Sequence, residues 1–148
     1  MKSLNEFRCS FTADSANEAL ARAALSAFII PADPTAQELA DLRTVISEAV
    51  TNAIVHGYRG TTGDVSVCLR MLPGRVIYIR VADKGCGIPD VRKAMEPLYT
   101  STPEEDRAGL GFAIMQSFTD SLHVRSREGQ GTVLTMRRRL GVQHEDEA

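Results

Sequence analysis

The sequence is poor in the features that mark membrane, secreted and nucleic-acid-binding proteins. Its 148 residues carry a formal net charge of −2 and include three cysteines. A charge so near to neutral gives no electrostatic basis for direct binding of nucleic acid or of an anionic membrane surface. No apolar run is long enough to cross a bilayer, and the residues that follow Met1 contain no apolar signal core.

The few cysteines also restrict the class of protein. Cys9, Cys68 and Cys86 are odd in number and lack the spacing of metal ligands. Free thiols are typical of a reducing compartment, so we expect a cytoplasmic protein. Cys86 stands between two glycines, but no histidine or other base is near it in the sequence. A role as a nucleophile is therefore not favoured.

What is present fits one globular domain that spans residues 1–148. Hydrophobic residues make up 43% of the chain and charged residues 24%, which are ordinary values for a domain with a buried core. The segment 141–148 is short and acidic, and we expect it to be a frayed tail.

Local patterns in the first third predict one strand and two helices. Apolar and polar residues alternate over 7–11, which predicts a half-buried strand. Residues 15–18 and 35–38 each have the spacing of a capping box, which predicts a helix start. We expect the second helix to run as far as Gly57, acting as a left-handed stop.

The remaining patterns predict a sheet and further helices. A hairpin around Pro73-Gly74 joins expected strands over 65–72 and 75–83. Further along we expect a short helix over 90–95, an irregular loop over 96–108, a helix over 110–119, and strands over 122–126 and 132–140. The helices can cover only one sheet face. We therefore expect an α/β fold of the α+β two-layer sandwich type, with a mixed, mostly antiparallel sheet.

Glu48 and Asn52 are four residues apart and share one helix face. A carboxamide oxygen is a good ligand for Mg²⁺, and a carboxylate can orient or deprotonate an attacking hydroxyl. The alternative is a solvated helix face. Val45 and Val55 fall in the same angular sector, however, which favours a half-buried Glu48 that needs a partner.

Asp83 ends an apolar strand face, and two glycines follow it. Its carboxylate can accept a hydrogen bond from an exocyclic amine such as that of adenine, and Gly85 and Gly87 leave room for a flat base. The alternative is a loop-capping Asp with turn glycines.

A helix is expected to start at Gly109 and Gly111, where free amides favour phosphate oxygens. The preceding segment, with the Thr100 hydroxyl and the Arg107 cation, is a candidate lid; a solvated surface loop is the alternative. Thr132 follows a Gly-x-Gly turn, where it either bonds the base-binding Asp or simply favours the strand.

Together these motifs resemble the ATP-binding superfamily of gyrase, heat-shock chaperone, sensor histidine kinase and mismatch-repair ATPases, which implies a Bergerat-type fold. Within it the chain is similar, over nearly its whole length, to the small anti-sigma-factor serine kinases of Gram-positive bacteria, above all to those of the sporulation anti-sigma-F type. The segments that carry this resemblance are 33–35, 47–54, 56–58, 83–90, 96–100 and 109–112.

The resemblance implies roles for individual residues. It makes Asn52 the Mg²⁺ ligand, Glu48 the base toward a serine hydroxyl, and Asp83 the reader of adenine. The other residues that it places in the ATP site are Gly85, Gly87, Thr100, Arg107, Gly109, Leu110, Gly111 and Thr132.

The resemblance also implies partners. A sigma factor of the sporulation sigma F type would be bound and silenced while ATP is held, and a serine of an anti-anti-sigma protein would be phosphorylated. The family also implies a homodimer, with Arg22 on the partner-binding surface. Two alternatives stay open: an anti-sigma kinase of the general stress response, and an ATP-gated binding module without kinase activity.

Overall fold

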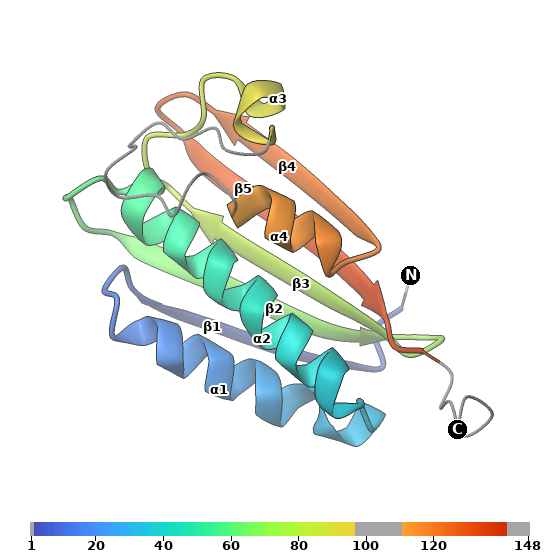
Figure 1. Ribbon diagram of the computed structural model, residues 1–148. Helices are drawn as coiled ribbons and strands as arrows, with labels where there is room; N and C mark the ends of the chain where they lie inside the picture. Colours follow the sequence, from blue (N-terminus) through green and yellow to red (C-terminus); the bar gives the residue numbers. More distant parts are fainter. Residues whose placement is uncertain (1, 97–110, 142–148) are drawn as a thin grey trace.

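The computed structural model of the chain describes residues 2–96 and 111–141, which form two layers (Figure 1). One layer is a sheet with the strand order β1-β2-β3-β5-β4. The strands are β1 (Asn5–Thr12), β2 (Asp64–Leu72), β3 (Val76–Asp83), β4 (Ser121–Arg127) and β5 (Gly131–Arg139). The helices are α1 (Asn17–Ile29), α2 (Ala36–Thr51), α3 (Val91–Ala94) and α4 (Gly111–Ser117).

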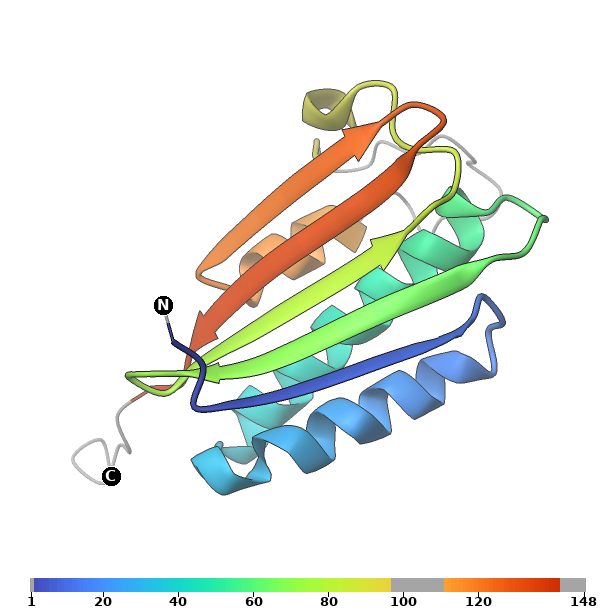
Figure 2. The ribbon, with the colours of Figure 1, turned by 180° about the vertical axis from the view of Figure 1, so that it is seen from behind.

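The expected two-layer fold is confirmed, with helices α1, α2 and α4 on one face of the sheet. Seen from behind, the described part of the chain leaves the other face uncovered (Figure 2). Among the described residues, no helix is both long enough and apolar enough to cross a membrane.

The expectation of a mixed sheet is wrong for the described strands, because each neighbouring pair is antiparallel. The chain passes through α1 and then α2, which run antiparallel to each other, between β1 and β2. β2 therefore starts beside the end of β1 and runs back along it. β3 and β4 do run in the same direction, but β5 turns back and lies between them. Parallel strands are therefore present without being paired.

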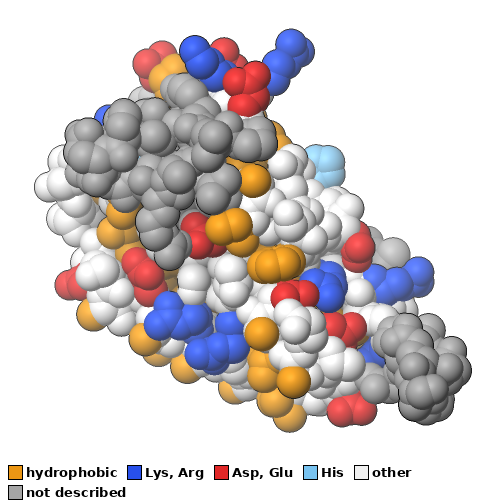
Figure 3. Space-filling model, in the orientation of Figure 1, with side chains coloured by type: hydrophobic (Ala, Val, Ile, Leu, Met, Phe, Trp, Pro, Cys, Tyr) orange, Lys and Arg blue, Asp and Glu red, His pale blue; other side chains and the backbone are white. Residues whose placement is uncertain are grey.

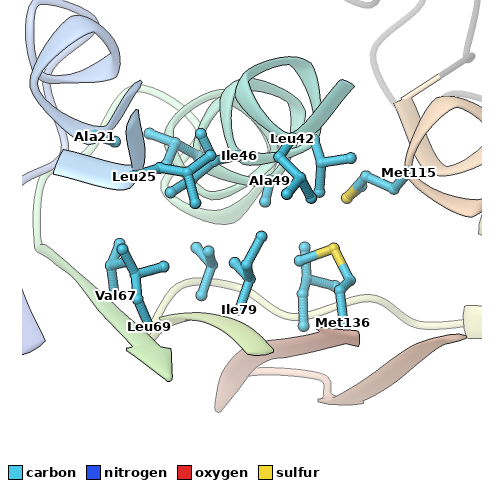
Figure 4. Close-up of a cluster of buried hydrophobic side chains, with 14 of the residues drawn as sticks. Ala21, Leu25, Leu42, Ile46, Ala49, Val67, Leu69, Ile79, Met115 and Met136 are labelled. Carbon is cyan, nitrogen blue, oxygen red and sulfur yellow. The ribbon is translucent and has the colours of Figure 1, made fainter. Parts of the chain in front are cut away.

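The core lies between the sheet and the helices. Leu69, Ile79 and Met136 are cross-strand neighbours on the covered face, and all three are buried. They point toward Leu42 and Ile46 of α2 (Figure 4). The alternation of strand residues and the spacing of the α2 stripe meet here in one apolar layer.

One of the two predicted capping boxes is confirmed. The Glu38 amide donates to Thr35 Oγ1 at 3.0 Å, and the Thr35 amide donates to Glu38 Oε1 at 2.9 Å. The box predicted at 15–18 is wrong, because α1 has no side-chain cap. There the Asp14 carboxylate accepts from the Ala16 amide at 2.9 Å, so the turn out of β1 takes over the capping role.

The predicted left-handed stop at Gly57 is also wrong. The α-helical part of α2 ends at Thr51 and continues as a π-helical turn over Asn52–Gly57, which we call the π turn. The positive φ angles come later, at Arg59 and Gly60. A glycine stands at position 57 for a different reason, because a Cβ there would lie 2.9 Å from the Asp83 carboxylate.

The two ends of the covered face differ. We call the end where β3 finishes and β5 begins the site end, and the end where α2 begins the closed end. At the closed end Arg138 of β5 forms an ion pair with Asp41 of α2 at 3.2 Å, and the Gly141 amide donates to Glu38 Oε2 at 2.7 Å. Of the loop predicted over 96–108, residues 97–108 lie outside the described residues, as does the tail after Gly141.

Candidate functional site

The last turn of α2 forms one wall of the site. Glu48 is half-buried, as the sequence predicts. A Cβ built on Gly111, the first residue of α4, would lie 3.3 Å from Glu48 Oε1. The structure therefore brings Glu48 against the start of α4, although the two residues are far apart in the sequence. The absence of a side chain at Gly111 keeps the space beside the carboxylate open.

Asn52 begins the π turn directly after this wall. Its backbone amide still donates to the carbonyls of Glu48 and Ala49. The Tyr58 amide then donates to the Ala53 carbonyl at 3.0 Å, five residues back. Such widened turns recur at functional sites because they redirect the side chains and backbone that follow. Here the turn carries Gly57 down onto the end of β3.

Asp83 lies at that end with 6% of its surface exposed. The Gly85 amide donates to Asp83 Oδ1 at 2.8 Å. Burial raises the pKa of the Asp83 carboxyl, while the amides of Gly85 and Thr132 act in the opposite direction. A carboxylate has about four lone-pair positions, so two amide donors leave acceptor capacity for a ligand. The carboxylate is buried at some cost and retains unused hydrogen-bonding capacity.

Gly85 and Gly87 hold the loop after Asp83 against two other segments. A Cβ at Gly85 would lie 2.0 Å from the Gly57 carbonyl oxygen, and one at Gly87 would lie 2.2 Å from the Arg127 carbonyl oxygen. Gly87 also has a φ of +76°, which disfavours side chains. On the side where a Cβ would lie, each of these glycines is therefore packed against backbone. These glycines shape the floor of the site.

Two backbone hydrogen bonds fix this loop from both sides. The Cys86 amide donates to the Gly57 carbonyl at 2.7 Å, and the Gly129 amide donates to the Cys86 carbonyl at 2.6 Å. A Cβ at Gly131 would lie 2.1 Å from the Asp83 carbonyl oxygen. The end of α2, the loop after β3 and the β4–β5 turn therefore form one packed unit around Asp83.

Thr132 is the next residue in this unit and the direct β5 partner of Asp83. It is buried, with 3% of its surface exposed. The sequence left open whether Thr132 bonds the Asp or only favours the strand. The strand register places Thr132 directly opposite Asp83, and its backbone amide acts to lower the pKa of the Asp83 carboxyl, while its hydroxyl lies 2.8 Å from Ser126 Oγ.

Sequence reasoning missed two residues of this unit. Ser126 of β4 accepts from the Ile88 amide at 2.7 Å and lies 2.8 Å from Thr132 Oγ1. Tyr58 donates to the Asp64 carbonyl at 2.7 Å and accepts from the Lys84 amide at 3.0 Å. Ser126 lies in no recognised motif, and Tyr58 was noted only as part of the segment 56–58 that carries the family resemblance, with no role assigned. The strand register and the path of the π turn bring them to the site.

Some predicted residues cannot be placed and one lies elsewhere. Thr100, Arg107, Gly109 and Leu110 are outside the described residues. Arg22 of α1 donates to Ser47 Oγ at 3.0 Å, one residue before Glu48. It is half-buried and tied to α2, on the outer side of the helix that carries the site.

The residues present fit a nucleotide with its metal ion. Asp83 supplies a buried acceptor for an amine, and Glu48 and Asn52 supply a carboxylate and an amide oxygen one helical turn apart. An amide oxygen suits Mg²⁺, which takes most of its other ligands from water and phosphate. In the described residues no cluster of three or more acidic, His or Cys side chains forms an all-protein metal site.

Comparison with known proteins agrees with this chemistry. The model of the histidine kinase-like ATPase domain family matches residues 11–138. An anti-sigma F factor of Pasteuria penetrans is 47% identical over 137 residues, covering 92% of this chain and 91% of the relative. One of Clostridium acetobutylicum is 43% identical over 138 residues, covering 93% and 96%.

A solved structure supports the fold independently. The RsbU and RsbW domains of a Mycobacterium tuberculosis protein superpose with a TM-score of 0.67 at 20% identity, covering 92% of this chain and 32% of that one. At this identity the likeness concerns the fold alone. With the family model and the relatives, it leads to one assignment: the chain belongs to the histidine kinase-like ATPase domain family and, within it, to the group of the anti-sigma F factors.

Proposed function

We propose that the chain is an ATP-dependent protein serine kinase that also binds and inhibits a sigma factor. The observation that carries the proposal is the site end itself. A buried acceptor, Asp83, ends a strand of the sheet, and a carboxylate–amide pair, Glu48 and Asn52, lies where α2 passes into the π turn that packs on that strand end. The chain also shares 43–47% identity with proteins named anti-sigma F factors.

Asp83 selects the base in this proposal. Its ionised carboxylate accepts a hydrogen bond from the exocyclic amine of adenine, and the amides of Gly85 and Thr132 hold the carboxylate in place. Because Asp83 is buried, water does not compete for this hydrogen bond, and the interaction is stronger than at the surface.

Glu48 acts on the incoming serine. Its half-buried carboxylate faces the start of α4 and orients the serine hydroxyl, then accepts its proton as the oxygen attacks. Bound ATP supplies the γ-phosphoryl group. Asn52, one turn further, would hold Mg²⁺ through its amide oxygen. The amides at Gly111, with Gly109, Leu110, Thr100 and Arg107 before it, would bind the phosphates.

The partners follow from the relatives and from the surface. The relatives are named for a sigma factor, and we propose the same partner here, of the sporulation sigma F type. The substrate would be a serine of its anti-anti-sigma protein. Arg22 donates a hydrogen bond to Ser47, the residue before Glu48. Along α1, apolar side chains gather beside basic ones (Figure 3). Leu20 of α1 and Ile30, the residue directly after α1, are among the exposed apolar residues. We also propose a homodimer that acts in the cytoplasm.

The test is phosphoryl transfer by the purified full chain to an anti-anti-sigma protein, with labelled ATP and Mg²⁺. Glu48→Gln is expected to lower the rate at least about 100-fold and to leave the Kd for ATP within about threefold. Glu128→Gln, the same change at an exposed position in the β4–β5 turn, is the matched control and keeps the normal rate. A normal rate for Glu48→Gln would remove Glu48 as the base.

Two alternatives are separated by further outcomes. If the chain binds ATP and captures the sigma factor but transfers no phosphate at saturating Mg²⁺, it is an ATP-gated binding module. If it captures a general-stress sigma factor in place of a sporulation one, the kinase proposal stands and the pathway changes. Pull-down of each sigma factor with ATP, with ADP and without nucleotide distinguishes these cases.

A further inference from the structure

Three polar side chains lie next to each other across the site end. Asp83 of β3 is paired with Thr132 of β5, and Thr132 is paired with Ser126 of β4. They lie on the covered face, because Thr132 keeps the alternation of the buried Leu134 and Met136. Directly paired side chains have Cβ atoms about 5 Å apart, so the three act as neighbours.

Ser126 makes more contacts than one hydroxyl usually does. Its Oγ accepts from the Ile88 amide at 2.7 Å, donates to the Gly131 carbonyl at 3.0 Å and lies 2.8 Å from Thr132 Oγ1. These contacts join β4 to the loop after β3 and to the first two residues of β5. Ser126 is thus the common partner of the segments that surround Asp83.

The proton count favours one direction for the contact between the hydroxyls. A serine hydroxyl has one proton and two lone pairs. We assign the Ser126 proton to the Gly131 carbonyl, which can only accept, and one Ser126 lone pair to the Ile88 amide. In this assignment Thr132 donates to the remaining lone pair, which is one of the two directions that the 2.8 Å contact between the hydroxyls allows. Its proton points toward Ser126, and only its lone pairs are left for the space beside Asp83.

This arrangement of hydrogen bonds makes the site favour one kind of purine base. Next to a bound base stand two acceptors, the Asp83 carboxylate and the Thr132 oxygen, without a hydroxyl donor between them. A purine with an amino group at position 6 satisfies them, whereas a carbonyl oxygen at position 6 would face acceptors only. A buried acceptor without a donor is costly, so such sites discriminate strongly.

Building on the proposed function, in which adenine binds at Asp83, we propose that Ser126 is a positioning residue that sets the purine preference of the site. It acts through Thr132, by holding the threonine proton away from the ligand. Loss of the Ser126 hydroxyl frees the Thr132 hydroxyl to turn and donate to a carbonyl oxygen. The site then loses its preference for the amino group.

The experiment measures Kd by calorimetry for ATP and for inosine triphosphate (ITP), with Mg²⁺, on the full chain. The two nucleotides differ at two neighbouring positions: in ITP a carbonyl oxygen replaces the amino group at position 6, and N1 carries a hydrogen where adenine N1 has a lone pair. Ser126→Ala is expected to weaken ATP about tenfold and to lower the ratio of the ITP and ATP dissociation constants at least about fivefold. Ser126→Thr keeps the hydroxyl and should restore the ratio.

Two controls separate this role from a structural one. Ser121→Ala makes the same change in β4 on the opposite sheet face and should leave both constants unchanged. In a Thr132→Val background, Ser126→Ala should no longer change the ratio, because the residue through which it acts is gone. Loss of the Ile88 contact alone would weaken both nucleotides equally.

The outcomes are distinct. If Ser126→Ala weakens ATP and ITP by the same factor, or changes neither, the inference is overturned while the proposed function stands. If the double variant shows the full change in ratio, Ser126 does not act through Thr132, and the inference is again overturned. If the unmodified chain binds no ATP, the proposed function fails and the inference fails with it.

Discussion

At the closed end of the sheet, charged side chains hold the two layers together, whereas at the site end close backbone contacts and the Tyr58 hydroxyl do so. Arg138, Asp41 and Glu38 join β5 to α2 at the closed end. At the site end, Gly57 and Gly85 let a helix end and a loop meet without side chains between them. The first arrangement fills space, and the second keeps space for a ligand beside the packed backbone.

The two ends also differ in the charges that they bury. The closed-end carboxylates have cationic or amide partners, and the pKa of Glu38 is lowered, against the effect of its own burial, by the amides of Thr35 and Gly141. The site-end carboxylate, Asp83, has a raised pKa. The closed end thus contributes stability, while Asp83 costs some, as is common where a residue is kept for function.

The largest effect is expected for Gly85→Ala at the site end. The new Cβ would lie 2.0 Å from a backbone oxygen that cannot rotate away. We expect ATP binding to fall more than about 100-fold and the free energy of unfolding to fall by about 3 kcal/mol or more. Calorimetry and urea unfolding measure the two. Gly60→Ala is the matched control, because nothing lies within 4 Å there and only its positive φ costs about 1 kcal/mol.

Leu42→Ala probes the apolar packing between α2 and the sheet. Leu42 is fully buried, and its loss should lower the free energy of unfolding by about 2–5 kcal/mol while the Kd for ATP of the folded protein changes less than about twofold. Leu42→Met, of similar volume, should cost less than about 1.5 kcal/mol. A large change in ATP affinity for Leu42→Ala would show that packing there and the site are coupled.

Asp83→Asn should show the opposite pattern to Leu42→Ala, with a large effect on ATP binding and a small effect on stability. We expect ATP binding to weaken about 10- to 100-fold and the free energy of unfolding at pH 7 to change by less than about 1 kcal/mol. Isothermal titration and thermal unfolding of the two proteins measure this. Retained ATP affinity would mean that another group reads the base.

The unmodified chain and Asp83→Asn should also differ in their pH dependence, because the pKa of Asp83 is raised. The folded protein binds this proton at a higher pH than the unfolded chain does, so the contribution of Asp83 to the free energy of unfolding falls as the pH rises through the folded pKa. ATP affinity has the opposite trend, since an amine needs the ionised carboxylate. The difference in ATP affinity between the unmodified chain and Asp83→Asn should shrink on acidification, at a pH above the ordinary range of Asp.

The smallest effect is expected for Thr35→Ala at the closed end, which removes half of the capping box. The free energy of unfolding should fall by about 1 kcal/mol, with no change in the Kd for ATP. Thr44→Ala, within α2, is the control, because its hydroxyl only donates to the Ala40 carbonyl one turn back. Equal losses for the two variants would argue against the cap as the cause.

Several features were predictable from sequence because they depend on neighbours along the chain. The Thr35–Glu38 capping box, the β2–β3 hairpin and the half-buried position of Glu48 are of this kind. The failures have different causes. The capping box at 15–18 lost to another local contact, in which the Asp14 carboxylate accepts from the Ala16 amide, whereas the stop at Gly57 was overridden by the tertiary approach to Asp83.

By itself the sequence determined the elements, the family and the chemical groups of the site, since periodicity, caps and motifs are properties of adjacent residues. Only the tertiary structure decided that β5 lies between β3 and β4, and with it that Asp83, Thr132 and Ser126 form one row. Strand order depends on which surfaces bury the most apolar area together, and no local pattern encodes that. The hydrogen bonds of Ser126 exist because of that order.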